Sequence, residues 1–122
     1  MKDREKLIRG DVIWVNLGEH PVSHVHSGQR PCIVISTNKS NGHVYTVIPG
    51  SCKMEKRQLP MHAILYPKES GCGLSRKTVF MAEQVTTVDK KQVLIKVGHI
   101  PEESDTWSRI NDIIIRQLDM GV

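Results

Sequence analysis

About six short apolar runs, separated by turn-forming residues, constrain this fold more than any other feature of the sequence. Each run is rich in β-branched or aromatic side chains and is too short for a typical helix. The runs span residues 12–17, 31–36, 43–48, 59–66, 78–85 and 93–97. Clusters of Gly, Pro, Asn and Ser lie between them, and Pro49-Gly50 is expected to stop the third run. The pattern predicts a small barrel or sandwich that is mainly β.

The last part of the chain changes its apolar period and predicts one helix. Apolar side chains recur at helical spacing, with Ile113 beside them. They are Trp107, Ile110, Ile114 and Leu118. Pro101 suits a first helical turn, and Gly121 comes just after the expected end. We therefore expect one amphipathic helix that packs on the β structure.

The chain has 122 residues, which is enough for one domain with a real core and too short for two. We expect a single domain over residues 1–122, with residues 1–8 as a charged, flexible lead-in. No apolar run approaches membrane-spanning length, so we expect a cytoplasmic protein with no membrane partner. A net charge of +4 is compatible with a polyanionic partner.

The three cysteines are an odd number and form no C-x-x-C pair. This pattern argues against a disulfide framework and against a thiolate zinc site. They are Cys32, Cys52 and Cys72.

Arg30 lies where a turn meets the second apolar run. Gly28 gives the backbone freedom, and Pro31 suits the first position of a strand. A rigid strand can hold the arginine in place, and its planar fork of N–H donors suits a phosphate. The alternative is a surface arginine beside a turn, and this stretch alone does not separate the two.

The long loop before Arg30 contains His20, His24 and His26. Imidazoles at this spacing can bind a transition metal, but the loop holds no cysteine and only Glu19 as a carboxylate. A histidine that transfers protons is the other interpretation, because its ordinary pKa lies near neutral pH.

A second group of candidates follows the third run. Ser51 can donate a hydrogen bond to a phosphate oxygen, or it is a simple turn serine. Lys53, Lys56 and Arg57 form a basic loop that either steers a single strand or is merely solvated. Glu83 is an acid–base candidate or one half of a structural ion pair.

Taken together, these landmarks resemble the MazF/PemK (Kid-like) toxins of bacterial toxin–antitoxin pairs. The matching segments run in order along almost the whole chain. They are the Arg9-Gly10-Asp11 turn with the strand to Val15, Gly28-Gln29-Arg30-Pro31, Val47-Ile48-Pro49-Gly50-Ser51, the segment 82–90 with Glu83-Gln84, and the Gly98-His99-Ile100 turn.

The resemblance implies an SH3-like barrel, a homodimer, and a sequence-specific endoribonuclease that cuts single-stranded mRNA without a metal or other cofactor. A ribose 2′-hydroxyl would attack the neighbouring phosphorus, leaving a 2′,3′-cyclic phosphate and a 5′-hydroxyl. The resemblance assigns catalytic roles to Arg30, Ser51, Glu83 and His24. It also implies a cognate antitoxin with an acidic tail.

The sequence departs from the family pattern just ahead of Arg30. Val25 stands where many members carry a glutamate, between His24 and His26. His24 is therefore the first candidate for proton transfer, and His26 is a second one. The expected RNA-binding residues are His26, Gln29, Lys53, Lys56, Arg57 and Gln84.

Two other functions fit the same residues. The departure at Val25 fits a non-catalytic SH3-like binding module, or a toxin of the same fold that poisons a protein such as gyrase. The histidine cluster fits a metallohydrolase, which a chelator would inactivate.

Overall fold

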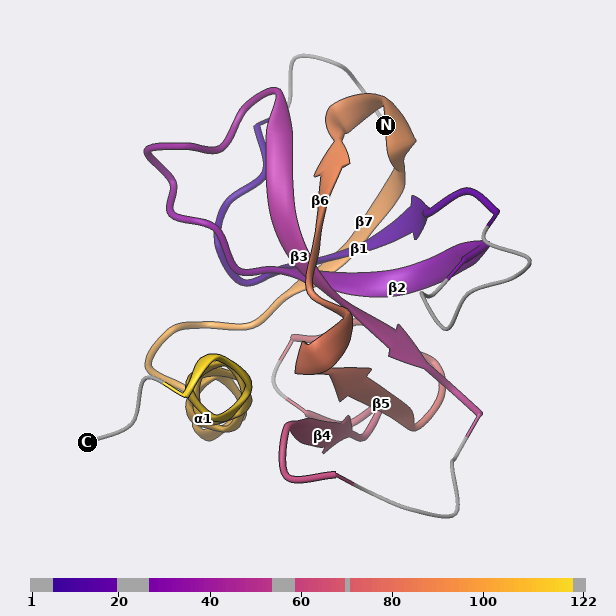
Figure 1. Ribbon diagram of the computed structural model, residues 1–122. Helices are drawn as coiled ribbons and strands as arrows, with labels where there is room; N and C mark the ends of the chain where they lie inside the picture. Colours follow the sequence, from indigo (N-terminus) through magenta and orange to yellow (C-terminus); the bar gives the residue numbers. More distant parts are fainter. Residues whose placement is uncertain (1–5, 20–26, 54–58, 70, 120–122) are drawn as a thin grey trace.

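The computed structural model describes residues 6–19, 27–53, 59–69 and 71–119. It contains seven strands, two single-turn 3₁₀ helices and one α-helix (Figure 1). The strands are β1 (Asp11–Asn16), β2 (Gln29–Val34), β3 (Val44–Ser51), β4 (His62–Leu65), β5 (Thr78–Met81), β6 (Thr86–Asp89) and β7 (Val93–His99). The 3₁₀ helices are η1 (Ala82–Gln84) and η2 (Lys90–Gln92), and the α-helix is α1 (Asp105–Leu118).

All strand pairs are antiparallel, and the order across the sheet is β4-β5-β3-β2-β1-β7. β3 is the centre of this arrangement, because its first half pairs with β6 and its end pairs with β5. The prediction of a mainly β protein with one C-terminal helix is confirmed. The sheet curves strongly, but the pairings among the described residues do not close it into a barrel.

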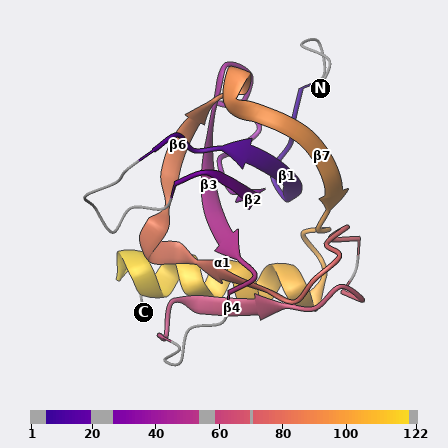
Figure 2. The same cartoon turned by 90° about the vertical axis from the view of Figure 1, so that its right-hand side faces the viewer.

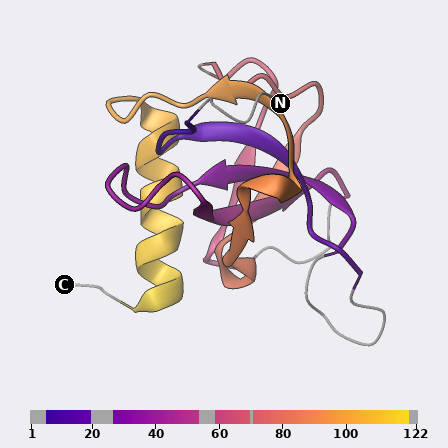
Figure 3. The same cartoon turned by 90° about the horizontal axis from the view of Figure 1, so that it is seen from above.

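The helix lies against the end of the sheet that β4 and β5 form. Figure 2 shows α1 running across this end beside β4, and Figure 3 shows it along one side of the curved sheet. Successive residues of β1 and β2 point to opposite faces. As a result the strands fill two separate cores, one beneath α1 and one inside the curve of the sheet.

The helix-side core contains Val12 and Ile33 from the sheet, and Trp107 and Ile110 from α1. The inner core contains Ile13, Cys32, Val34, Tyr45 and Val47, with other buried apolar residues. Leu7, which the sequence placed in the lead-in, is buried in the inner core and its amide donates to the Tyr45 hydroxyl, 3.3 Å away.

The sequence predicted that Pro49 and Gly50 stop the third strand, but they do not. β3 continues through them to Ser51, with Pro49 opposite Cys32 and Gly50 opposite Phe80. A Cβ on Gly50 would lie 2.7 Å from the Phe80 ring, so the glycine allows this close approach. The correction matters for function because it places Ser51 on a strand instead of in a free turn.

The expected strand over residues 78–85 is also wrong beyond Met81. The chain makes the η1 turn at Ala82–Gln84 and then enters β6, a strand that the sequence analysis missed. Asp89 ends β6 and caps η2 by accepting from the Lys91 amide at 2.8 Å. Local patterns overlooked β6 because a four-residue strand is held mainly by its pairing with β3.

The helix begins later than Pro101, which lies in the turn before it. Ser104 is the N-cap, and its hydroxyl oxygen accepts from the Trp107 amide at 3.1 Å. At the other end, Asp119 adopts the left-handed conformation with φ 51°. The helix has therefore already ended before Gly121. This glycine was expected just after the end of the helix, and it lies outside the described residues.

Candidate active-site cleft

Arg30 is held at the start of β2, opposite Val15 of β1. Its Nε donates to the Ser27 carbonyl oxygen at 3.0 Å, and the side chain is half-buried. The next residue, Pro31, is buried and lies opposite Trp14, which fixes the strand directly behind the arginine. The guanidinium also carries N–H donors on both Nη atoms, and these suit a phosphate.

Ser51 is the last residue of β3 and is almost fully buried. Its hydroxyl oxygen accepts from the Lys53 amide at 3.1 Å. Because the oxygen is the acceptor in this bond, the hydroxyl proton can be donated elsewhere.

The pairing of β2 with β3 brings Arg30 and Ser51 to one cleft of about 280 Å³. The cleft contains four of the site residues expected from the sequence: Gln29, Arg30, Ser51 and Lys53. Trp14, Ser27, Gly28, Pro31, Gly50 and Cys52 complete its lining. An arginine, a hydroxyl and a lysine around one small cavity are suited to bind a phosphodiester.

Sequence reasoning missed Trp14 and Cys52 as parts of this cleft. Trp14 alternates with the inner-core residues Ile13 and Val15, so strand periodicity places its ring on the other face of β1. That periodicity was a usable signal, although it does not say which residues lie opposite. Cys52 had no such signal, and it is exposed beside Ser51.

Cys32 is two residues beyond Arg30 and belongs to the inner core. Burial raises the pKa of its thiol to about 12, and the positive charge of Arg30 offsets only part of this effect. Its S–H lies 3.7 Å from the Arg30 carbonyl oxygen. A thiol in this state is not a nucleophile at neutral pH, so Cys32 supports the strand and does not react.

Glu83 is not part of the cleft lining. Its Oε2 lies 2.7 Å from Nε2 of His62, while Nδ1 of His62 accepts from the Leu59 amide at 3.3 Å. Nε2 therefore carries the proton and donates to Glu83. Oε1 of Glu83 is buried and has no hydrogen-bond partner among the described residues. The structure does not bring Glu83 together with Arg30 and Ser51, and its catalytic role stays a prediction.

Several other expected site residues cannot be placed. His24, His26, Lys56 and Arg57 lie outside the described residues, as do His20 and Val25. Gln84 is half-buried on η1, next to Glu83.

Within the described ranges, no group of three or more His, Cys, Asp or Glu side chains could hold a metal ion. In the same part of the chain, no helix is both long and apolar enough to cross a membrane.

A curved antiparallel sheet, a single C-terminal helix and an arginine–serine cleft at the strand ends define a small β protein with a candidate anion-binding site. Comparison with known sequences identifies its family. Residues 8–118 match the family described as PemK-like, MazF-like toxin of type II toxin–antitoxin system. The chain belongs to this family.

Similar proteins agree with this assignment. Endoribonuclease EndoA of Bacillus subtilis (strain 168) is 31% identical over 97 residues, which are 78% of this chain and 81% of EndoA. A crystal structure of MazF from Deinococcus radiodurans matches with a TM-score of 0.76 at 18% identity, covering 95% of this chain and 99% of that one.

A mycobacterial endoribonuclease in complex with its cognate antitoxin has a TM-score of 0.72 at 18% identity, covering 95% and 98% of the two chains. At these identities the two solved structures support the fold.

Proposed function

We propose that this protein is the toxin of a type II toxin–antitoxin pair and a metal-independent, sequence-specific endoribonuclease that cuts single-stranded mRNA. The observation that carries the proposal is the shared cleft of Arg30 and Ser51, with Lys53 at its rim. The similarity to EndoA, which is named an endoribonuclease, supports it.

In the proposed reaction, the 2′-hydroxyl of one nucleotide attacks the phosphorus that links it to the next. The new P–O2′ bond forms as the P–O5′ bond breaks, so the products are a 2′,3′-cyclic phosphate and a 5′-hydroxyl. Negative charge builds up on the phosphorane oxygens. The guanidinium of Arg30 and the hydroxyl of Ser51 are the donors that stabilise it.

The reaction also needs a base for the 2′-hydroxyl and an acid for the departing oxygen. His24 is our candidate for this proton transfer, and His26 is a second one. Glu83 would have to leave its hydrogen bond with His62 in order to take part. Gln29 and Lys53 are the RNA contacts within the cleft, and Lys56, Arg57 and Gln84 are further RNA contacts in the proposal.

The partners in this proposal are a second copy of the chain and a small antitoxin. The antitoxin carries an acidic tail that competes with RNA for the basic surface around Lys53. This is consistent with the mycobacterial structure, which is described as a complex with its cognate antitoxin. The toxin would act in the cytoplasm, where its mRNA substrate is found.

The test is to incubate the purified protein with a long RNA in excess chelator. The expected result is a set of discrete fragments whose 5′ ends a polynucleotide kinase labels without prior phosphatase treatment, because they are hydroxyls. Intact RNA with a gel shift would overturn the proposal in favour of a non-catalytic binding module. Cleavage that disappears in chelator would overturn it in favour of a metallohydrolase.

A further inference from the structure

From the strand that carries Ser51, the sheet continues through β5 to β4. In the β3–β5 pair, Ser51 lies opposite Val79, and in the β4–β5 pair, Leu65 lies opposite Thr78. The residues just outside these pairs are Lys77, before β5, and Tyr66, after β4. Two strand spacings separate β3 from β4, and Tyr66 lies two residues beyond Ile64, which is opposite Val79, so Tyr66 begins roughly 12 Å from Ser51.

Tyr66 and Lys77 present an aromatic ring and a cation together. The Nζ atom of Lys77 lies 5.6 Å from the centroid of the Tyr66 ring. Tyr66 is 50% exposed and belongs to neither core. A large aromatic residue left half in water beside a lysine is the combination that single-stranded nucleic acids use, since bases stack on the ring and phosphates meet the cation.

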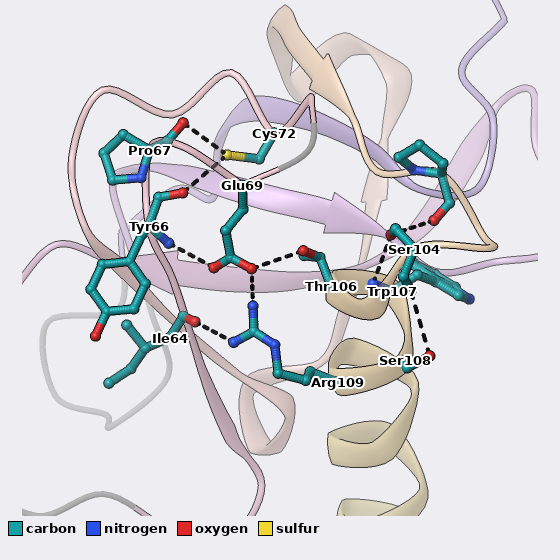
Figure 4. Close-up of polar contacts among 11 residues, drawn as sticks. Ile64, Tyr66, Pro67, Glu69, Cys72, Ser104, Thr106, Trp107, Ser108 and Arg109 are labelled. Atoms are coloured by element: carbon teal, nitrogen blue, oxygen red, sulfur yellow. Dashed lines mark hydrogen bonds and ion pairs between the residues drawn. The ribbon is translucent and has the colours of Figure 1, made fainter.

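The main chain of Tyr66 is fixed although its ring is exposed (Figure 4). Its amide donates to Oε2 of Glu69 at 2.9 Å, and its carbonyl oxygen accepts from the Glu69 amide at 2.9 Å. Cys72 donates its S–H to the same carbonyl oxygen, 3.6 Å away. Glu69 itself is held by Arg109 and by the Thr106 hydroxyl. Little ordering of the backbone is therefore needed when a ligand contacts the ring.

Tyr66 also lines a groove of about 650 Å³ between β4 and α1. The two arginines of this groove are already paired, Arg109 with Glu69 and Arg116 with Asp112. Lys77, which lies beside the Tyr66 ring, is a cation that can meet a phosphate at this end, while the groove gives room for a base.

We propose that Tyr66 and Lys77 form an accessory nucleotide subsite for single-stranded RNA, beyond the nucleotides that flank the scissile bond. A base stacks on the Tyr66 ring, and its phosphate contacts the Lys77 ammonium. The inference rests on the proposed function, because the RNA reaches this subsite from the arginine–serine cleft. The subsite makes tight binding depend on how far the RNA extends on one side of the cut. The cleft alone does not impose this requirement.

The experiment uses the full chain and RNA oligonucleotides built on its mapped cleavage site. One oligonucleotide ends at the minimal site, and two others extend it by four nucleotides in the 5′ or the 3′ direction. Each carries a 2′-deoxy nucleotide at the cut, so that binding is measured without cleavage. For the parent protein, one of the two extensions should tighten binding by about 5- to 150-fold, the range expected for one stacked base.

In Tyr66→Ala, the ratio of the two dissociation constants, minimal over extended, should fall towards one. Tyr66→Phe keeps the ring and should keep the ratio. Lys77→Ala should reduce the ratio and lower the salt slope of binding by about 0.7. Lys91→Ala, an exposed lysine on η2, is the matched charge control and should change neither.

A parent ratio near one for both extensions would overturn the subsite, as would a Tyr66→Ala variant that keeps the parent ratio. If Tyr66→Ala keeps the ratio but weakens binding of the cognate antitoxin, the surface is a protein contact and the subsite is again overturned. Failure of the proposed function would look different, since the parent would then cut no RNA of any length.

Discussion

Nδ1 of His99 lies 2.8 Å from Oδ1 of Asp11, and this contact joins the end of β7 to the start of β1. Asp11 is completely buried, and it also accepts from the Ile8 amide at 2.8 Å and pairs with Lys96 at 3.3 Å. One buried carboxylate thus ties β1 to the turn before it and to β7.

Replacing Asp11 by Ala should therefore destabilise the fold. The Ile8 amide and His99 would both lose their acceptor, and a hydrogen bond to a charged group contributes about 1.5 to 3 kcal/mol. Urea unfolding followed by circular dichroism measures this loss. Lys96→Ala is the control: it removes only the ion pair, from a lysine side chain that is 42% exposed, and leaves Asp11 with its Ile8 amide and His99 partners, so it should destabilise less. Equal stabilities of Asp11→Ala and the parent would contradict the role given to this carboxylate.

Arg30→Ala should remove most of the cleavage activity. By analogy with the loss of one donor to a developing oxyanion, kcat should fall by about 100- to 1,000-fold. The guanidinium is only half-buried and lies at the start of a strand. The free energy of unfolding should therefore fall by much less than the activation free energy of cleavage rises. The measurement is single-turnover cleavage of a labelled RNA. Lys39→Ala removes an exposed cation of the turn before β3 and should cleave like the parent.

Glu69 should make stability depend on pH in the acid range. Partial burial acts to raise the pKa of Glu69, but the hydrogen bonds from Arg109, the Tyr66 amide and Thr106 outweigh it and hold the pKa below its ordinary value of 4.5. A group with a lowered pKa in the folded state stabilises the fold above its unfolded pKa, and this contribution is lost as the pH falls through the folded pKa.

The comparison is with Glu69→Gln. At pH 7 the parent should be the more stable of the two in urea, and the difference should shrink as the pH falls below about 4.5, towards and past the folded pKa. A difference that stays constant from pH 7 to pH 3 would show that the Glu69 charge is not responsible.

Gly50→Ala should disturb the cleft through the core. The added Cβ would lie 2.7 Å from the Phe80 ring and 2.8 Å from the Thr78 methyl group, so the strands must move apart. Overpacking of this kind costs about 1 to 3 kcal/mol, and the adjacent Ser51 should shift with it. Both the urea midpoint and the cleavage rate should fall. Ser75→Ala, in the exposed part of the loop before β5, should change neither.

The three cysteines should differ sharply in reactivity. Cys52 is exposed, whereas Cys32 and Cys72 are buried. The pKa of Cys32, about 12, leaves almost no thiolate at pH 8. Iodoacetamide at this pH should therefore alkylate Cys52 first, and the other two only after unfolding, which peptide mass spectrometry would show. Fast labelling of Cys32 in the folded protein would contradict its place in the inner core.

Much of this structure could be predicted from local patterns. Short β-branched runs between turn residues define β1, β2 and β7 closely, because side-chain shape and backbone preference act within a few residues. The helical period from Trp107 to Leu118 predicted α1 for the same reason. Arg30 before Pro31 was also readable, since a turn, a strand start and a charge are neighbours in the sequence.

Tertiary structure decided which of these residues meet. Ser51 reaches Arg30 because β3 pairs with β2, and it lies on a strand because Gly50 lets the Phe80 ring pack closely. From the sequence, Glu83 was expected to belong to the same site as Arg30. In the structure it lies on η1 and its carboxylate is hydrogen-bonded to His62. Strand register and close packing depend on contacts between residues that are far apart in the chain, and local sequence patterns do not encode them.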